Sequence, residues 1–232
     1  MPTGSDSIES AADEIAKRIV SLRGSNTESI RVLRREYSKR LANSPARFVV
    51  HVALRLLCNN TTIAHRFVSY ELVNKHPPAL ASLTEKDIKQ FGAGIDSWGS
   101  VDMFGCYLTG LAWRQHQLSE RLIHSWARSK DRWWRRAALV STVPLNSKAR
   151  GGNGDTNRTL EVCELLAEDR DDMVVKALSW ALRELAKRDP GAVREFLTRN
   201  HDRLAARVIR EVNNKLSTGL KNTRLASASM TK

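Results

Sequence analysis

Hydrophobic residues recur every three to four positions through almost the whole chain, and no stretch shows the sustained alternation of a strand. This pattern predicts an all-α protein. One apolar stripe, at about 100° per residue, consists of Val101, Phe104, Leu108 and Leu111. Trp98 and Asp102, one turn apart, fall about 140° away from that stripe. An indole and a carboxylate therefore share a helix face that does not build the core.

Capping residues, prolines and glycines divide the pattern into helices. Thr84 with Asp87 resembles a capping box for a short helix, and Ser44-Pro45 is a typical helix start. The other predicted helices cover residues 7–22, 27–41, 45–57, 65–74, 100–113, 119–128, 131–143, 156–167, 171–187, 190–198 and 202–216. Residues 144–157, which contain three glycines, are predicted to form a mobile surface loop. We expect a disordered N-terminus over residues 1–6, one α-helical domain over 7–216, and a basic disordered tail over 217–232.

Two segments forty residues apart resemble each other. Asp131-Arg132-Trp133-Trp134-Arg135-Arg136-Ala137-Ala138-Leu139 aligns with Asp171-Asp172-Met173-Val174-Val175-Lys176-Ala177-Leu178-Ser179. In both, an aspartate opens the helix and a basic residue precedes an alanine. Helix pairs that recur at about 40 residues are typical of HEAT-type repeats, which stack because one pair cannot bury its apolar face alone. The predicted fold is a HEAT-like repeat superhelix, an α-solenoid with a concave basic groove.

Charge indicates the partner. The 232 residues include 38 Lys and Arg against 25 Asp and Glu, a formal net charge of +13, which favours nucleic acid as the ligand. The first residues lack the apolar run of a secretion signal, and no window approaches the roughly 18 apolar residues of a membrane span. We therefore expect a cytoplasmic protein, nucleoid-associated when bound to DNA, and no membrane partner. The three cysteines and six histidines show no metal-binding spacing, so no metal or cofactor is expected.

A second helix face also combines aromatic and basic residues. Trp180 lies about 140° from the core stripe of its helix, on the same line as Lys176, Arg183 and Lys187. An indole among cations suits a nucleic-acid backbone, because the ring packs on sugar or base while the cations bind phosphates. Arg136 occupies the position of Lys176 in the preceding repeat, which predicts another phosphate ligand.

Each of these residues also has an ordinary structural interpretation. Asp102 lies in a first helical turn, where a carboxylate suits the helix dipole. Trp98 is also compatible with a hydrophobic staple, Trp180 with burial under the next helix, and Arg136 with a solvated surface position. We expect the other four tryptophans, Trp113, Trp126, Trp133 and Trp134, to belong to the core.

The chain resembles the HEAT-like-repeat DNA alkylation repair enzymes, the AlkD-type DNA glycosylases, from about Ile30 to Leu216. Ser97-Trp98-Gly99-Ser100-Val101-Asp102 is similar to the family motif Trp-Asp-x-Val-Asp, and Trp133-Trp134-Arg135-Arg136-Ala137-Ala138 to Trp-x-x-Arg-Ala-Ala. The segment from Lys176 to Glu184 is similar to Lys-Ala-x-x-Trp-x-Leu-Arg-Glu. Gly99 stands where the family usually has an aspartate, so Ser97 or Ser100 is expected to cap this helix.

The resemblance implies that Asp102 is the catalytic carboxylate, that Trp98 and Trp180 contact the lesion nucleotide, and that Arg136 holds a backbone phosphate. It implies a monomeric, monofunctional glycosylase that removes N3-methyladenine and N7-methylguanine from duplex DNA. A noncatalytic protein that binds branched or distorted DNA is the alternative, and a protein-binding solenoid is a third. We expect the Asp102 carboxylate to face the concave hollow; a salt link beneath packed side chains would argue against repair.

Overall fold

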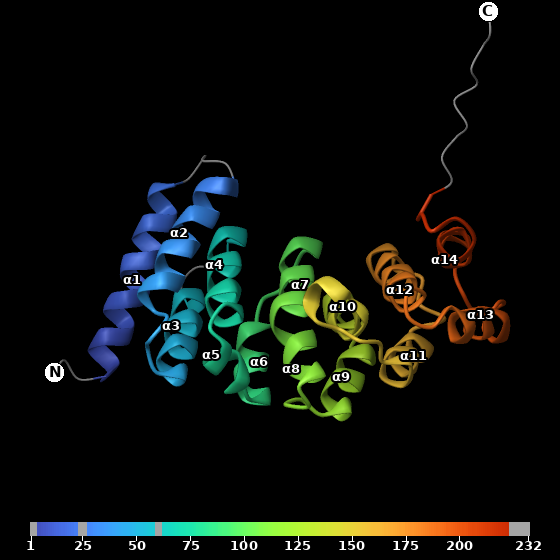
Figure 1. Cartoon of the computed structure of the whole chain (residues 1–232), viewed down its shortest axis with the longest axis horizontal. Helices are drawn as coiled ribbons and strands as arrows, with labels where there is room; N and C mark the ends of the chain where they lie inside the picture. Colours follow the sequence, from blue (N-terminus) through green and yellow to red (C-terminus); the bar gives the residue numbers. More distant parts are fainter. Residues whose placement is uncertain (1–3, 23–26, 59–61, 223–232) are drawn as a thin grey trace, which may run out of the picture.

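The computed structural model describes residues 4–22, 27–58 and 62–222 and shows an elongated array of helices, with the first helix at one end and the last two helices at the other (Figure 1). No strand occurs in the described residues. The first half contains α1 Gly4–Ser21, α2 Thr27–Arg40, α3 Ala46–Cys58, α4 Ile63–Asn74, α5 Pro77–Ala81, α6 Glu85–Phe91, α7 Trp98–Phe104, the π-helix η1 Gly105–Thr109 and α8 Gly110–Arg114. The second half contains α9 Glu120–Ala127, α10 Arg132–Asn146, the 3₁₀ helix η2 Lys148–Arg150, α11 Thr156–Leu165, α12 Asp172–Leu185, α13 Pro190–Arg199 and α14 Ala206–Thr218.

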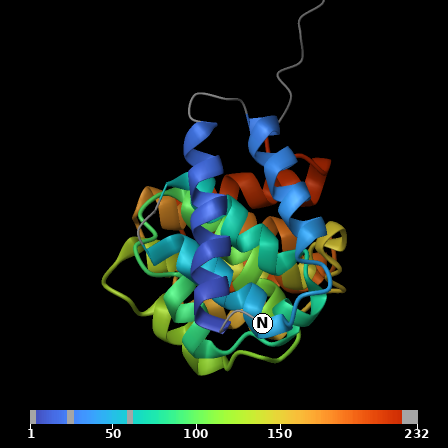
Figure 2. The same cartoon turned by 90° about the vertical axis from the view of Figure 1, so that its left-hand side faces the viewer.

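The helices stack in sequence. One row consists of α2, α4, α7, α10, α12 and α14, in which each helix contacts the next. Viewed from the N-terminal end, α1 and α2 stand side by side in front of the later helices (Figure 2). The stack confirms the predicted all-α class, whereas its regularity as a HEAT-like superhelix stays a prediction.

The core runs along this stack in two sections. The smaller section joins α1 to α4 around Ile15, Leu33 and Leu56, and the larger section continues from α3 to α14. The predicted stripe of Val101, Phe104, Leu108 and Leu111 is buried in the larger section, as expected. Trp113 and Trp126 are buried as well, and Trp133 and Trp134 pack against the same core. The apolar periodicity thus predicted the buried faces correctly.

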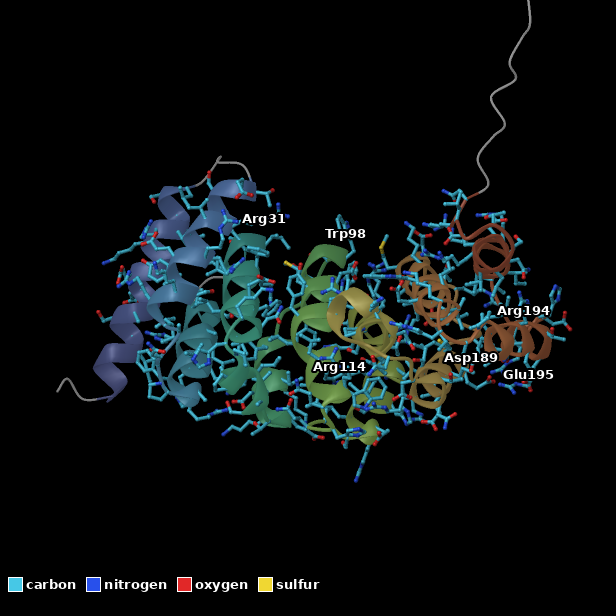
Figure 3. The ribbon with its side chains drawn as sticks, in the orientation of Figure 1. Arg31, Trp98, Arg114, Asp189, Arg194 and Glu195 are labelled. Atoms are coloured by element: carbon cyan, nitrogen blue, oxygen red, sulfur yellow. The ribbon has the colours of Figure 1, made fainter. Side chains whose placement is uncertain are left out.

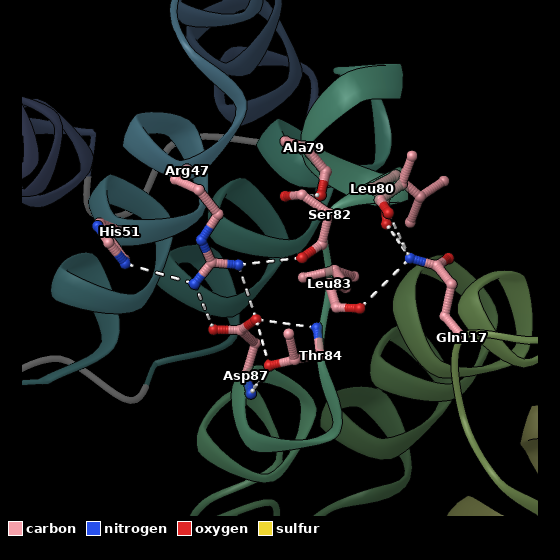
Figure 4. Close-up of polar contacts among 10 residues, drawn as sticks. Arg47, His51, Ala79, Leu80, Ser82, Leu83, Thr84, Asp87 and Gln117 are labelled. Atoms are coloured by element: carbon pink, nitrogen blue, oxygen red, sulfur yellow. Dashed lines mark hydrogen bonds and ion pairs between the residues drawn. The ribbon is translucent and has the colours of Figure 1, made fainter.

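Polar side chains fix the turns around the start of α6 (Figure 4). The predicted capping box is present, because Thr84 accepts from the Asp87 amide and the Asp87 carboxylate accepts from the Thr84 amide at 2.9 Å. Arg47 of α3 donates to both oxygens of Asp87, each at 2.8 Å. The Gln117 amide donates to three carbonyls at and just after the end of α5, including that of Ala81 at 2.8 Å. These contacts hold α3, α5, α6 and the segment after α8 in one arrangement.

Two glycines let α10 approach the helix that carries Asp102. A Cβ at Gly105 would lie 2.5 Å from a methyl carbon of Val140, and one at Gly110 would lie 2.5 Å from the Ser141 carbonyl oxygen. Any larger residue would force the helices apart. Between these glycines the chain adopts the π-helical turn η1, and the Thr109 hydroxyl lies 2.6 Å from that of Ser141. The closeness of α10 to α7 and η1 is therefore fixed by the backbone.

Several predicted boundaries were wrong. Helix α1 begins at Gly4 rather than residue 7, α14 extends to Thr218, and α10 continues through Pro144 to Asn146. Residues 1–3 and 223–232 of the predicted termini lie outside the described residues. The segment after α10 is also anchored more firmly than a surface loop, because Arg188 donates to the carbonyls of Asn146 (2.8 Å) and Gly152 (2.7 Å).

Candidate active site

Helix α7 begins with a serine cap that directs Trp98 outward. The Ser97 hydroxyl accepts from the Ser100 amide at 3.4 Å, and the Ser100 hydroxyl accepts from the Ser97 amide at 3.2 Å, which confirms the expected serine cap. Trp98 is the first helical residue and its side chain is 63% exposed, an unusual state for an indole. A Cβ at Gly99 would lie 3.5 Å from Ile63 of α4, an ordinary contact, so a side chain at this position would meet no close obstacle there.

Asp102, one turn later, forms a two-pronged ion pair with Arg136 of α10. The Arg136 Nε and Nη2 atoms donate to the two carboxylate oxygens at 2.8 and 2.9 Å, and its Nη1 donates to the Met173 carbonyl at 2.5 Å. The side chain of Arg136 is only 7% exposed. The guanidinium of Arg136 is thus buried and all three of its nitrogens have partners, so a phosphate contact by Arg136, which stays a prediction, would require one of these bonds to break.

The salt link satisfies one part of the condition that would argue against repair, but the other part is not met. The Asp102 side chain is 22% exposed and lines an open cavity, so packed side chains do not cover it. Burial raises the pKa of Asp102 above its ordinary value, and the Arg136 ion pair acts in the opposite direction. Since a carboxylate has about four lone-pair directions and Arg136 occupies two, the others are available toward the cavity.

The cavity has a volume of about 690 Å³ and extends from α2 to α12. Three predicted site residues line it together: Trp98 and Asp102 of α7, and Trp180 of α12. Figure 3 shows Trp98, at the start of α7, and Arg31 of α2 on the same edge of the molecule. The remaining lining residues are Thr27, Ile30, Arg31, Ile63, Ala64, Phe67, Gly99, Met103, Cys106, Tyr107 and Arg150.

The predicted cations near Trp180 do not line this cavity. Arg183 is the least accessible of them: its side chain is 17% exposed, its Nε donates to the Ser179 hydroxyl at 3.1 Å, and Glu211 lies 4.0 Å away. Lys176 and Lys187 pair with Asp172 and Glu184 at 2.6 and 2.5 Å but keep 41% and 48% exposure. Exposed pairs of this kind are weak, so these two lysines are still candidates for phosphate contact outside the cavity.

Sequence reasoning missed Arg150 and Tyr107. Tyr107 follows Asp102 in the same helical run, and its position on the cavity side depends on the π-helical turn, which no sequence pattern indicated. Arg150 comes from the glycine-containing segment that was predicted to be a mobile loop. The next residue, Gly151, has φ +76°, a conformation that glycine adopts readily and other residues do not. The glycine at this position was therefore the sequence signal for a fixed turn.

The described part of the chain contains neither a group of metal ligands nor a membrane-spanning helix. No group of three or more His, Cys, Asp or Glu side chains is arranged there to hold a metal ion. None of the described helices combines the length and apolar character needed to cross a bilayer.

Comparison with known proteins identifies the family of this chain. A search of curated proteins and a search of solved structures found no similar protein. The family model described as DNA alkylation repair enzyme matches residues 8–216, which is most of the chain and nearly the range predicted for the helical domain. The matched range contains Trp98, Asp102, Arg136 and Trp180. This chain therefore belongs to the DNA alkylation repair enzyme family.

Proposed function

We propose that this protein is a monofunctional DNA glycosylase that hydrolyses the N-glycosidic bond of cationic alkylpurines, such as N3-methyladenine and N7-methylguanine, in duplex DNA. The family assignment supports a role in alkylation repair. The observation that carries the finer proposal is one cavity lined by a partly exposed carboxylate, Asp102, and two indoles, Trp98 and Trp180.

A single carboxylate suits this substrate. Alkylation at N3 or N7 gives the purine a positive charge, so the base leaves as a neutral molecule without first being protonated. A second carboxyl group acting as general acid, which most glycoside hydrolases need, is then dispensable. The positive charge that develops on the deoxyribose is stabilised by the Asp102 carboxylate, which also orients the attacking water.

The surrounding residues have supporting roles. The indole faces of Trp98 and Trp180 attract a cationic base by cation–π interaction. Arg136 acts through Asp102 rather than on the substrate, because its two-pronged contact fixes the orientation of the carboxylate. It also favours the ionised form of Asp102 against the effect of burial, which the mechanism requires at neutral pH.

Base release from methylated duplex DNA tests this proposal. We expect the wild type to release N7-methylguanine or N3-methyladenine, and Asp102→Asn to reduce the single-turnover rate by at least about a hundredfold, as expected for loss of one transition-state charge contact. Asp202→Asn is the matched control, because Asp202 is fully exposed and distant in sequence from the cavity. No release by the wild type, or equal release by Asp102→Asn and wild type, contradicts the proposal.

The Asp102–Arg136 ion pair also favours the alternative of a noncatalytic protein that binds branched or distorted DNA. A carboxylate neutralised by a buried guanidinium is a normal structural element, and Arg136 would then serve only to join α7 to α10. This alternative predicts salt-sensitive DNA binding without base release, and binding that Asp102→Asn changes only through stability.

A further inference from the structure

The cations at the proposed active site differ in whether they are already neutralised. Arg136 is paired with Asp102, and Arg31 lies 3.8 Å from Glu28. By contrast, Arg150 lines the same cavity and makes no ion pair within 4.0 Å to any carboxylate of the described residues. An incoming anion therefore meets the Arg150 charge without displacing a protein acid of the described residues, whereas at Arg31 it competes with a weak, exposed pair to Glu28.

The fold holds Arg150 firmly in this place. Its guanidinium lies over the Tyr107 ring at 5.2 Å from the centroid, and its Nη1 atom donates to the Cys106 carbonyl at 3.4 Å. Its own carbonyl accepts from Arg114, and the next residue, Gly151, turns the chain with φ +76°. Side chain and backbone are thus both anchored, which lowers the entropic cost of binding a ligand at the guanidinium.

The anchor point also relates Arg150 to Asp102. Cys106, which accepts the Arg150 hydrogen bond, follows Asp102 by four residues, a rise of about 6 Å along a helix. A deoxyribose whose C1′ carbon faces Asp102 carries phosphates on its 3′ and 5′ oxygens, so one of these groups lies within a nucleotide length of the carboxylate. The Nη2 and Nε atoms of Arg150 make no hydrogen bond to the described residues and can donate to phosphate oxygens as a fork.

We propose that Arg150 binds the phosphodiester adjacent to the lesion nucleotide and so holds the deoxyribose against Asp102. This contact is separate from the phosphate contact predicted for Arg136, and the inference rests on the proposed glycosylase function. The residue is a binding residue, and Asp102 keeps the chemical step.

Salt dependence of duplex binding gives a direct readout. We expect Arg150→Gln to weaken binding of methylated duplex DNA about tenfold at 0.1 M salt, and to reduce the slope of log K against log salt by about one, as for the loss of one phosphate contact. Lys148→Gln is the matched control, since Lys148 belongs to the same short helix η2, is exposed and does not line the cavity. Arg150→Lys, which keeps the charge, should retain most of the slope.

Modified DNA locates the contact. With a neutral methylphosphonate on either side of a single N7-methylguanine, one of the two duplexes should bind wild type about tenfold more weakly, and Arg150→Gln should cause no further loss on that duplex. Equal salt slopes for Arg150→Gln and Lys148→Gln overturn the inference. It is also overturned if Arg150→Gln weakens binding to both modified duplexes as much as it weakens binding to the unmodified phosphodiester duplex. The inference is also overturned if Arg150→Gln and Arg150→Lys both have a lower melting temperature and both lose DNA binding, because the role of Arg150 is then structural.

These outcomes are separate from those of the glycosylase test. If Asp102→Asn abolishes base release but Arg150→Gln behaves like Lys148→Gln, the glycosylase proposal stands and the Arg150 inference fails. If wild type releases no base, the glycosylase proposal fails whatever the salt slopes show.

Discussion

Replacing Arg136 by methionine tests the ion pair on which the arrangement of the site depends. The substitution removes two hydrogen bonds to Asp102 and one to the Met173 carbonyl. Breaking a fully buried pair costs about 3–5 kcal/mol, whereas exposed pairs contribute about 0.2–1 kcal/mol. Because the two side chains are 7% and 22% exposed, we expect Arg136→Met to lower the free energy of unfolding by about 2–4 kcal/mol at neutral pH.

The loss should depend on pH in a defined direction. Burial raises the pKa of Asp102, Arg136 opposes this, and removing Arg136 raises that pKa further. A carboxyl group whose pKa is higher in the folded than in the unfolded state favours folding when protonated, and its ionisation costs stability as the pH rises. The difference in stability between wild type and Arg136→Met should therefore be small below about pH 4 and grow as the pH rises through the raised pKa.

Urea unfolding of four proteins provides the measurement: wild type, Arg136→Met, Asp102→Asn and the double variant. With a slope of about 2–3 kcal/mol per molar urea, the predicted loss moves the midpoint of Arg136→Met by about 1 M. In the Asp102→Asn background the same substitution should cost about 1–3 kcal/mol less, which is the coupling expected for residues in contact. An equal loss in both backgrounds, unchanged between pH 4 and pH 8, would refute the assigned coupling between Asp102 and Arg136.

Two further substitutions test the surrounding structure. Gly105→Ala places a methyl group 2.5 Å from Val140 and should lower the free energy of unfolding, measured in urea, by about 1–3 kcal/mol. Gly191→Ala, where the added methyl group has its nearest neighbour 3.7 Å away, should cause no such loss. Equal effects of the two substitutions would show that the position of α10 does not depend on the close approach at Gly105. Burial opposes ionisation of Asp87, but Arg47 and Thr84 outweigh it and hold the pKa of Asp87 at about 2, so its stabilisation is present above about pH 4 and lost as the pH falls toward 2. Asp87→Asn should cost about 1–2 kcal/mol at pH 7, a range that allows for the exposure of Arg47, and should flatten the loss of stability between pH 4 and 2 relative to Asp202→Asn. If Asp87→Asn loses as much stability between pH 4 and 2 as the wild type does, the lowered pKa assigned to Asp87 is wrong.

Local features of the fold could be predicted from the sequence because each depends on a few neighbouring residues. The aspartates forty residues apart, Asp131 and Asp171, both cap their helices by accepting from the amide two residues later, at 2.8 and 2.9 Å. The Thr84–Asp87 box and the Ser97 cap are local in the same sense. The outward direction of Trp98 followed from helical periodicity alone, and its exposure confirms it.

Ion pairing was not predictable in this way. Arg136 and Arg183 lie on the helix faces that periodicity assigned to solvent, yet each is covered by a neighbouring element that supplies an acid, Asp102 for one and Glu211 for the other. The partners are separated by 34 and 28 residues, respectively, so their pairing depends on how α10 and α14 pack against the rest of the stack. A sequence shows that a cation faces outward from its own helix, but not whether a second helix lies there.

The difference between features within one helix and contacts between helices also explains why the sequence predicted only part of the candidate site. Trp98 and Asp102 belong to one helix, and Trp180 reaches the cavity from α12, which packs against α10. The approach of α10 permitted by Gly105 and Gly110 brings Arg136 to Asp102, and the anchored turn after α10 brings Arg150 to the cavity wall. Two arginines of this region therefore differ in their surroundings: Arg136 within α10 is paired with Asp102, whereas Arg150, in η2 after the end of α10, has no acid within 4.0 Å among the described residues. Excess positive charge in the composition indicated DNA, but only the packing determines which of the 38 basic residues are available to meet it.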